Sequence, residues 1–129
     1  SKLGGSYSGV RDSNLPVAKE GTLLKDINFA FNSSRLTKAE KAKLNKNAEW
    51  LKENGSRVQI EGHCDARGTE EYNLALGERR ARSVYNFLKD AGVRGSQMST
   101  ISYGESVPLD TGTGEEAWAR NRRVYFNIR

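Results

Sequence analysis

The 129-residue sequence contains few of the side chains that form disulfide bonds or bind metal ions. It has a single cysteine, Cys64, and a single histidine, His63. One cysteine excludes an internal disulfide framework, and one cysteine with one histidine gives too few soft ligands for a structural zinc site. We therefore expect neither a metal nor any other cofactor.

Long apolar runs are also absent. No stretch of the sequence approaches the roughly 20 residues that are needed to span a membrane. The chain does not open with the basic-then-apolar pattern of a signal peptide. Hydrophobic residues make up 36% and aromatic residues 9% of the chain, which allows a modest core within the length of a single domain.

Charged residues, in contrast, are abundant. They make up 29% of the chain, and the formal net charge is +5. This charge favours an anionic partner such as nucleic acid, acidic lipid or a carboxylate-rich polymer, and does not choose among them. The basic residues that are open to interpretation as a nucleic-acid patch are Lys38, Lys41, Lys43, Lys46, Arg122 and Arg123. Because aromatic residues rarely interleave with them, we expect a solvated face and no nucleic-acid partner.

The chain divides into a tail and one domain. Residues 1–21 contain four glycines and Pro16 and have no periodic apolar pattern, which predicts a flexible N-terminal tail or tether. Residues 22–129 show alternating periodicities of strands and helices. The predicted order, β-α-β-α-β-(α)-β, indicates an α/β (α+β) two-layer sandwich.

Local patterns place these elements along the sequence. Alternating apolar residues predict strands near residues 27–31, 58–61, 101–103 and 124–128. Apolar residues with helical spacing predict helices from about residue 37 to 55 and from about 69 to 91, and a short third helix through 118. Capping boxes are predicted at Thr37 with Glu40 and at Thr113 with Glu116. Gly77 is a candidate for a kink in the second helix.

A polar segment, Gly62-His63-Cys64-Asp65-Ala66-Arg67-Gly68, follows the second predicted strand. Such a position often carries binding groups. Cys64 and His63 are adjacent in an extended segment, so their side chains point to opposite faces and are poorly placed to share a proton. Without another histidine to assist, we interpret Cys64 as a small, half-buried core residue and the chain as not an enzyme.

Asp65 in this segment allows two interpretations. It can cap the turn that follows, or it can form a site with one of the arginines of the second helix, Arg79, Arg80 and Arg82. An aspartate and an arginine that face one cleft are matched to a zwitterion, because the arginine binds a carboxylate and the aspartate accepts from an ammonium group. An internal Asp–Arg salt bridge is the alternative, and the residues alone do not rank the two.

Four motifs carry a resemblance to a known family: Ile60–Thr69, Glu71–Ala81, Ser102–Glu105 followed by Pro108, and Asn121–Val124. On these motifs, from about Leu23 to Arg129, the sequence resembles the OmpA-like C-terminal domain family, and within it the peptidoglycan-associated lipoprotein (Pal) branch. The resemblance implies a four-stranded mixed sheet with helices on one face. It also implies non-catalytic binding of peptidoglycan.

In that family the ligand is the diaminopimelate residue of the peptidoglycan stem peptide. The resemblance implies that Asp65 accepts from the ligand ammonium and that Arg80 binds its carboxylate, and neither residue is expected to be needed for folding. Further binding residues are then Phe31, Asn32, Gly68, Thr69, Asn73 and Leu76. The lipoprotein branch usually has an aspartate where this chain has Asn32, which puts in doubt any ligand contact that needs a carboxylate there.

The resemblance also implies a cellular setting. The protein would lie at the periplasmic face of the outer membrane, attached by an N-terminal lipid anchor upstream of this sequence, and would tether that membrane to the cell wall. Its partners would be peptidoglycan and the Tol system proteins, including a periplasmic TolB-type propeller. Two alternatives stay open: the periplasmic domain of another OmpA-like protein (an outer-membrane barrel or a stator) and a basic nucleic-acid-binding domain.

Overall fold

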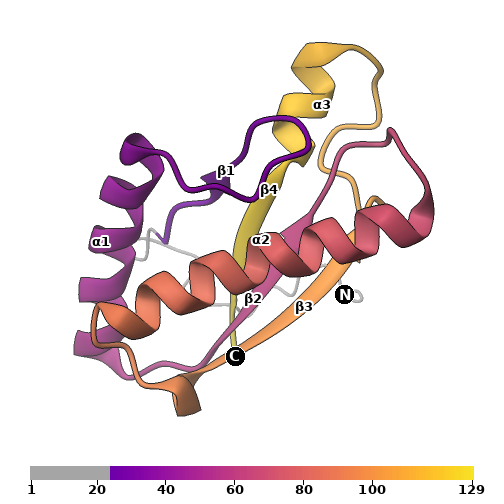
Figure 1. Ribbon diagram of the computed structural model, residues 1–129. Helices are drawn as coiled ribbons and strands as arrows, with labels where there is room; N and C mark the ends of the chain where they lie inside the picture. Colours follow the sequence, from indigo (N-terminus) through magenta and orange to yellow (C-terminus); the bar gives the residue numbers. More distant parts are fainter. Residues whose placement is uncertain (1–23) are drawn as a thin grey trace.

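The computed structural model describes residues 24–129 as one four-stranded sheet with helices packed on it (Figure 1). The predicted tail, residues 1–21, lies outside the described residues. The elements in chain order are β1 (Ile27–Asn28), α1 (Lys38–Asn54), β2 (Val58–His63), α2 (Glu70–Asp90), a short 3-10 helix η1 (Gly95–Gln97), β3 (Met98–Gly104), α3 (Glu115–Asn121) and β4 (Arg123–Ile128). This order confirms the predicted α/β (α+β) class.

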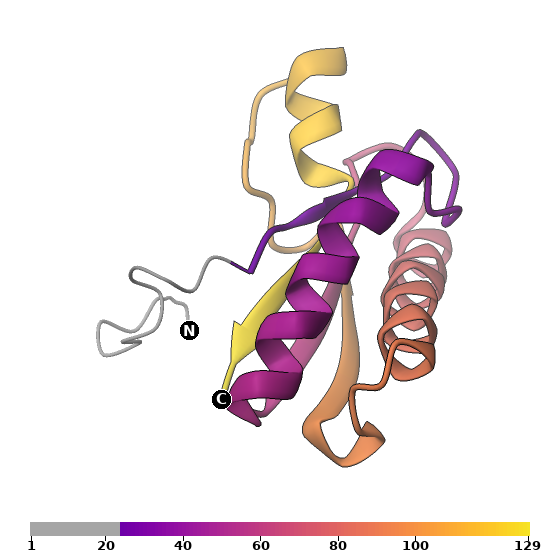
Figure 2. The ribbon, with the colours of Figure 1, turned by 90° about the vertical axis from the view of Figure 1, so that its left-hand side faces the viewer.

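The sheet is mixed, with the strand order β1-β4-β2-β3. β2 and β3 are parallel and are connected through α2, whereas β4 is antiparallel to both β1 and β2. The long helices α1 and α2 cover one face of the sheet, and α3 stands beyond its end (Figures 1 and 2). This arrangement confirms the two-layer sandwich and places the loop after β2 near α3.

The core lies between the sheet and the two long helices. Each helix contributes an apolar stripe at helical spacing, and all core members are buried. The main contributors are Leu44, Ala48 and Leu51 from α1, Ala81, Val84 and Leu88 from α2, and Ile27, Val58, Ile60, Val124 and Phe126 from the strands. The apolar periodicity of the sequence therefore identified the packed faces correctly.

Two glycines allow α2 to lie directly against β2. A Cβ atom on Gly62 would lie 1.9 Å from the carbonyl oxygen of Gly77, and one on Gly77 would lie 2.2 Å from Oγ of Ser102. No side chain fits at such distances, so this helix–sheet contact requires glycine on both sides. The contact brings the first half of α2 close to the loop that follows β2.

The capping prediction for α1 is half right. The Thr37 hydroxyl accepts from the amide of Glu40 at 3.4 Å, as expected. The Glu40 carboxylate does not return to Thr37 but accepts from the amide of Asn28 at 2.9 Å. Glu40 therefore connects α1 to β1 and does not complete a capping box.

The second predicted capping box is wrong. α3 begins after Gly114, whose φ of 105° lies in the left-handed region, and no side chain caps this end of the helix. Thr113 therefore lies one residue too early to act as the cap, since the cap position belongs to Gly114.

The first strand is shorter than predicted. β1 ends at Asn28, although the amide of Phe29 still donates to the carbonyl of Arg122 at 3.0 Å. The chain then turns at Phe31 and Asn32, and Asn32 has a φ of 58°. Phe31 is consequently 57% exposed, and its assignment to a half-buried strand is wrong.

The expectation of a solvated basic face holds only in part. Lys38, Lys41 and Lys46 are exposed. Arg122 and Arg123 are buried. Arg122 binds the carbonyl of Phe29 and pairs with Asp65 and Glu115, and Arg123 faces Asp26. Their assignment to a solvated face is wrong.

We expect Leu88→Ala to lower the free energy of unfolding by about 2–5 kcal/mol, because the fully buried leucine would leave a cavity in the core. Urea denaturation followed by circular dichroism measures this loss. Leu74 on the same helix is 41% exposed, so Leu74→Ala is the matched control and should change stability little. Equal effects of the two substitutions would contradict the orientation of α2.

Candidate functional site

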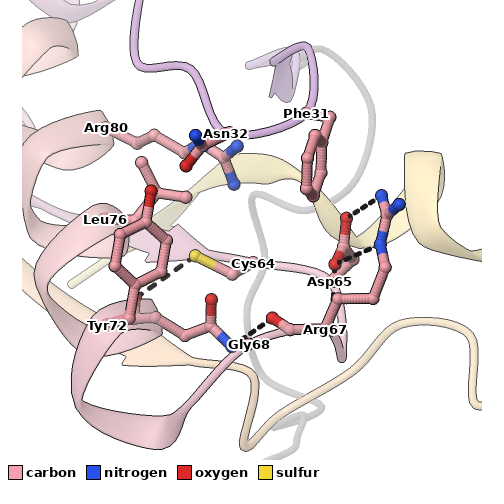
Figure 3. Close-up of a pocket in the computed structure, with 10 residues that line it drawn as sticks. Phe31, Asn32, Cys64, Asp65, Arg67, Gly68, Tyr72, Leu76 and Arg80 are labelled. Atoms are coloured by element: carbon pink, nitrogen blue, oxygen red, sulfur yellow. Dashed lines mark hydrogen bonds and ion pairs between the residues drawn. The ribbon is translucent and has the colours of Figure 1, made fainter.

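A cleft opens at the end of β2, between the first half of α2 and the turn after β1 (Figure 3). The residues that line it are Phe31, Asn32, Cys64, Asp65, Arg67, Gly68, Tyr72, Asn73, Leu76 and Arg80. Asp65 and Arg80, which are distant in the sequence, face the same cleft. Seven of the eight binding residues expected from the sequence are among these, and Thr69 is not: its hydroxyl accepts from the amide of Tyr72 at 3.1 Å and caps α2.

Asp65 forms the acidic end of the cleft and is only 4% exposed. Its Oδ1 accepts from the backbone amide and Nε of Arg67 at 3.0 and 3.2 Å. Its Oδ2 accepts from Nη2 of Arg67 at 2.8 Å and from Nη1 of Arg122 at 3.3 Å. Burial raises the pKa of Asp65, but the hydrogen bonds from the two arginines outweigh it and leave this pKa below its ordinary value. The carboxylate is therefore ionised.

Arg80 forms the basic end and is fully buried. Its Nε donates to the carbonyl of Ser33 at 2.8 Å, Nη1 to that of His63 at 2.9 Å and Nη2 to that of Ala30 at 3.1 Å. Since a guanidinium has five N–H donors, one on each terminal nitrogen is left over. This side chain therefore connects α2, the end of β2 and the turn after β1, and the expectation that Arg80 is not needed for folding stays a prediction.

Arg80 also differs from the other buried arginines in its charge balance. Within residues 24–129, none of the ion pairs includes Arg80, whereas Arg122 pairs with Asp65 and Glu115, and Arg123 lies 3.9 Å from Asp26. Burial lowers the pKa of Arg80, and the negative charges nearby only partly offset this effect. In this described part of the chain, the cleft thus ends at a buried cation with no direct carboxylate partner.

The wall between the two ends is mostly apolar. Leu76 and Tyr72 of α2 lie on one side in Figure 3, Phe31 lies near Asp65, and Cys64 lies between the ends. The Sγ atom of Cys64 donates to the carbonyl of Asn73 at 3.2 Å, and burial raises the pKa of this thiol. A protonated, hydrogen-bonded thiol is a poor nucleophile.

His63 lies away from Cys64, as the alternation of the strand predicts. Its ring stacks on Tyr103 with centroids 5.5 Å apart, and Nε2 lies 3.4 Å from Oε1 of Glu61. His63 and Cys64 therefore contact different parts of the protein and share no proton.

Asn73 fixes the loop that carries Asp65. Its side-chain amide donates to the carbonyl of Arg67 at 2.9 Å and to the carboxylate of Glu105. Gly68, with a φ of 95°, lets the loop turn back toward α2. The acidic end of the cleft is thus held in place from α2 and from the segment after β3.

Two arginines of the site were not predicted from the sequence. The guanidinium of Arg67 lies between the rings of Phe31 and Trp118, 4.0 Å from each centroid, while it pairs with Asp65. Arg122 donates from Nε to the carbonyl of Phe29 at 2.9 Å in addition to its ion pairs. The pair of Asp65 with Arg67 could have been predicted, because the two residues lie two positions apart in the sequence. Nothing in the sequence near Asp65 indicates its contact with Arg122.

The described residues offer no other obvious chemistry. Within residues 24–129, no three histidine, cysteine, aspartate or glutamate side chains are grouped so as to hold a metal ion. In the same part of the chain, no helix combines the length and the apolar character needed to cross a bilayer. The cleft with its two charged ends is therefore the candidate site.

We expect the stability of the domain to fall as the pH drops below about 6.5, the ordinary pKa of histidine. Burial lowers the pKa of His63 more than its contact with Glu61 raises it, so the unfolded chain takes up a proton that the folded chain resists. His63 is the only histidine in the sequence. His63→Gln should flatten the dependence of unfolding free energy on pH between 5 and 7, as measured by urea denaturation; an unchanged slope would contradict the assignment.

Known proteins share this fold and much of this sequence. Residues 28–122 match the OmpA family. The chain is 42% identical over 120 residues to the peptidoglycan-associated lipoprotein of Pseudomonas putida, an alignment that covers 93% of this chain and 72% of the relative. It is 46% identical over 99 residues to the protein of that name from Legionella pneumophila, covering 76% and 56% of the two chains.

Solved structures of known proteins have the same fold as this chain. The peptidoglycan-associated lipoprotein from Burkholderia pseudomallei superposes with a TM-score of 0.79 at 37% identity and covers 92% of this chain and 98% of its own. The C-terminal domain of Helicobacter pylori MotB superposes with a TM-score of 0.76, covering 81% and 84% of the two chains, and at 20% identity it shows the common fold alone. The chain therefore belongs to the OmpA family, in the branch of the peptidoglycan-associated lipoproteins.

Proposed function

We propose that this protein is a non-catalytic binding module that holds peptidoglycan through the diaminopimelate residue of the stem peptide. The observation that carries this proposal is the fully buried Arg80, which has no carboxylate partner within residues 24–129 and faces the same cleft as the ionised Asp65. The free end of diaminopimelate carries one carboxylate and one ammonium group, and the cleft offers one charged side chain for each.

Arg80 is the receptor for the ligand carboxylate. A buried cation without an anionic partner is unfavourable, so a carboxylate that enters the cleft gains more here than at a solvated arginine. The two N–H groups left on the terminal nitrogens can bind both carboxylate oxygens in parallel. Asn32 lines the same part of the cleft, and its amide can donate to the carboxylate without the repulsion that an aspartate would add.

Asp65 is the receptor for the ammonium group. It is ionised and buried, so a charge-assisted hydrogen bond to it is strong. Between it and Arg80 the side chains of Leu76, Tyr72 and Phe31 suit the methylene groups of the ligand, as expected of a site with an apolar wall and a few polar contacts.

The names of the relatives support a wider role. Because these relatives are called peptidoglycan-associated lipoproteins, we propose that the full-length protein is lipid-anchored at the periplasmic face of the outer membrane and tethers that membrane to the cell wall. On the same basis we propose the Tol system proteins, among them a TolB-type propeller, as partners.

The nucleic-acid alternative has lost part of its support. Two of the basic residues on which it was based, Arg122 and Arg123, are buried and lie close to acidic groups. The other alternative is the periplasmic domain of an outer-membrane barrel or stator protein. Such a domain would have the same cleft chemistry and a different membrane attachment. The sequence of the complete gene separates the two: an upstream lipobox indicates a lipoprotein, and barrel strands or a transmembrane helix indicate the alternative.

We expect Asp65→Asn and Arg80→Lys each to weaken binding to purified sacculi by more than about tenfold. Removal of one partner from a desolvated charge pair costs about 2–5 kcal/mol, and 1.4 kcal/mol corresponds to tenfold. The lysine retains the charge at position 80 but cannot offer two parallel donors. Cosedimentation with sacculi, competed with free meso-diaminopimelate, measures the effect.

Three matched variants control this experiment. Asp90→Asn and Arg82→Lys make the same changes at exposed positions of α2 and should bind normally. Leu88→Ala controls for lost stability, because it weakens the core without touching the cleft. If folded Asp65→Asn and Arg80→Lys proteins bind sacculi like the wild type, the proposal fails. Tighter binding of Asp65→Asn to DNA, with binding of Arg80→Lys to DNA little changed, would favour the nucleic-acid alternative.

A further inference from the structure

Both oxygens of the Asp65 carboxylate already accept hydrogen bonds from side chains of the protein. A carboxylate offers about four lone-pair positions, and four donors already occupy Asp65: the amide, Nε and Nη2 of Arg67, and Nη1 of Arg122. A ligand ammonium therefore cannot simply be added to this carboxylate. At least one of the present donors has to leave.

The donors of Asp65 differ in how firmly they are held. The backbone amide of Arg67 belongs to the loop that Asn73 fixes to α2. The side chain of Arg122 is 8% exposed and also binds the carbonyl of Phe29 and the carboxylate of Glu115. The side chain of Arg67 is 34% exposed, and within residues 24–129 the hydrogen bonds of its guanidinium all go to Asp65. Arg67 is thus the donor that is most easily replaced.

The surroundings of Arg67 allow its guanidinium to move. Its guanidinium also lies over the rings of Phe31 and Trp118, 4.0 Å from each centroid. Stacking on an aromatic face has no strict direction, in contrast to a hydrogen bond, so the guanidinium can shift between the rings and keep this attraction. Glu115 is exposed and already attracts Arg67 electrostatically, so a carboxylate is near the displaced charge.

We propose that Arg67 is an exchangeable counter-ion of Asp65, which the ligand ammonium replaces on binding. This inference rests on the proposed function. In the unliganded protein Arg67 neutralises the buried carboxylate. On binding, one cation takes the place of another, so a ligand that lacks the ammonium group cannot break the pair. Arg67 thereby lowers the affinity for every ligand and makes the site selective for those with a free amino group.

The experiment compares the wild type with Arg67→Ala. This substitution keeps the backbone amide of residue 67 and the contact from Arg122, so Asp65 stays partly neutralised. The ligands are the soluble stem tripeptide L-Ala-γ-D-Glu-meso-diaminopimelate and the same peptide with its free amino group acetylated. By calorimetry we expect Arg67→Ala to bind the free-amino peptide about fivefold more tightly, or about 1 kcal/mol at 1.4 kcal/mol per tenfold. The acetylated peptide should stay weak for the wild type.

Arg120→Ala is the matched control, because Arg120 is an exposed arginine on α3 that pairs with Asp110. It should leave the affinity for the free-amino peptide unchanged. Equal or weaker binding by Arg67→Ala would overturn the exchange and make Arg67 a ligand contact or a positioning residue. A wild type that binds neither peptide would refute the proposed function itself, which is a distinguishable result.

A second measurement keeps Arg67 in place. The indole of Trp118 stacks on Arg67, so its fluorescence should change when the free-amino peptide displaces the guanidinium. The measurement uses a Trp50→Phe background, because Trp50 is the other tryptophan of the chain. A spectrum that stays constant at saturating peptide would contradict the displacement.

Discussion

Arg80 donates hydrogen bonds to three carbonyls that belong to two different segments of the chain, while its own backbone lies in α2. The turn after β1 and the end of β2 are therefore held against the helix by one buried guanidinium. The same side chain keeps one N–H free on each terminal nitrogen and has no direct carboxylate partner in the described part of the chain. The order of the cleft and the proposed affinity for an anion thus depend on a single group.

The buried charges at the two ends of the cleft are stabilised by different kinds of group. Asp65 is neutralised within the protein by Arg67 and Arg122, whereas Arg80 is surrounded by three backbone carbonyls and by the ring of Phe29, 5.2 Å from its centroid. Binding of a zwitterion would supply the missing anion at Arg80 and exchange one cation for another at Asp65. The close approach of Gly62 and Gly77 places α2, which carries Arg80, against the end of β2, which Asp65 follows.

Much of the fold could be predicted from the sequence, because the apolar periodicity that forms α1, β2 and α2 reflects burial on one face of each element. The resemblance to the OmpA family indicated Asp65 and Arg80, and the structure brings both to one cleft, although their ligand contacts stay a proposal. The burial of Arg122 could not be predicted, because its contact with Asp65 joins residues 57 positions apart. The exposure of Phe31 could not be predicted either. The apolar alternation in the sequence continues from Phe29 to Phe31, whereas the pairing of β1 with β4 ends at Asn28.

The central claim is that Asp65 and Arg80 bind the two charges of one amino acid centre. A crystal structure of the domain with meso-diaminopimelate tests it most directly. We expect the ligand carboxylate on the two terminal nitrogens of Arg80 and the ammonium on Asp65, with the guanidinium of Arg67 moved off the Asp65 carboxylate. A ligand bound elsewhere, with the cleft empty and the Asp65–Arg67 pair intact, would contradict it.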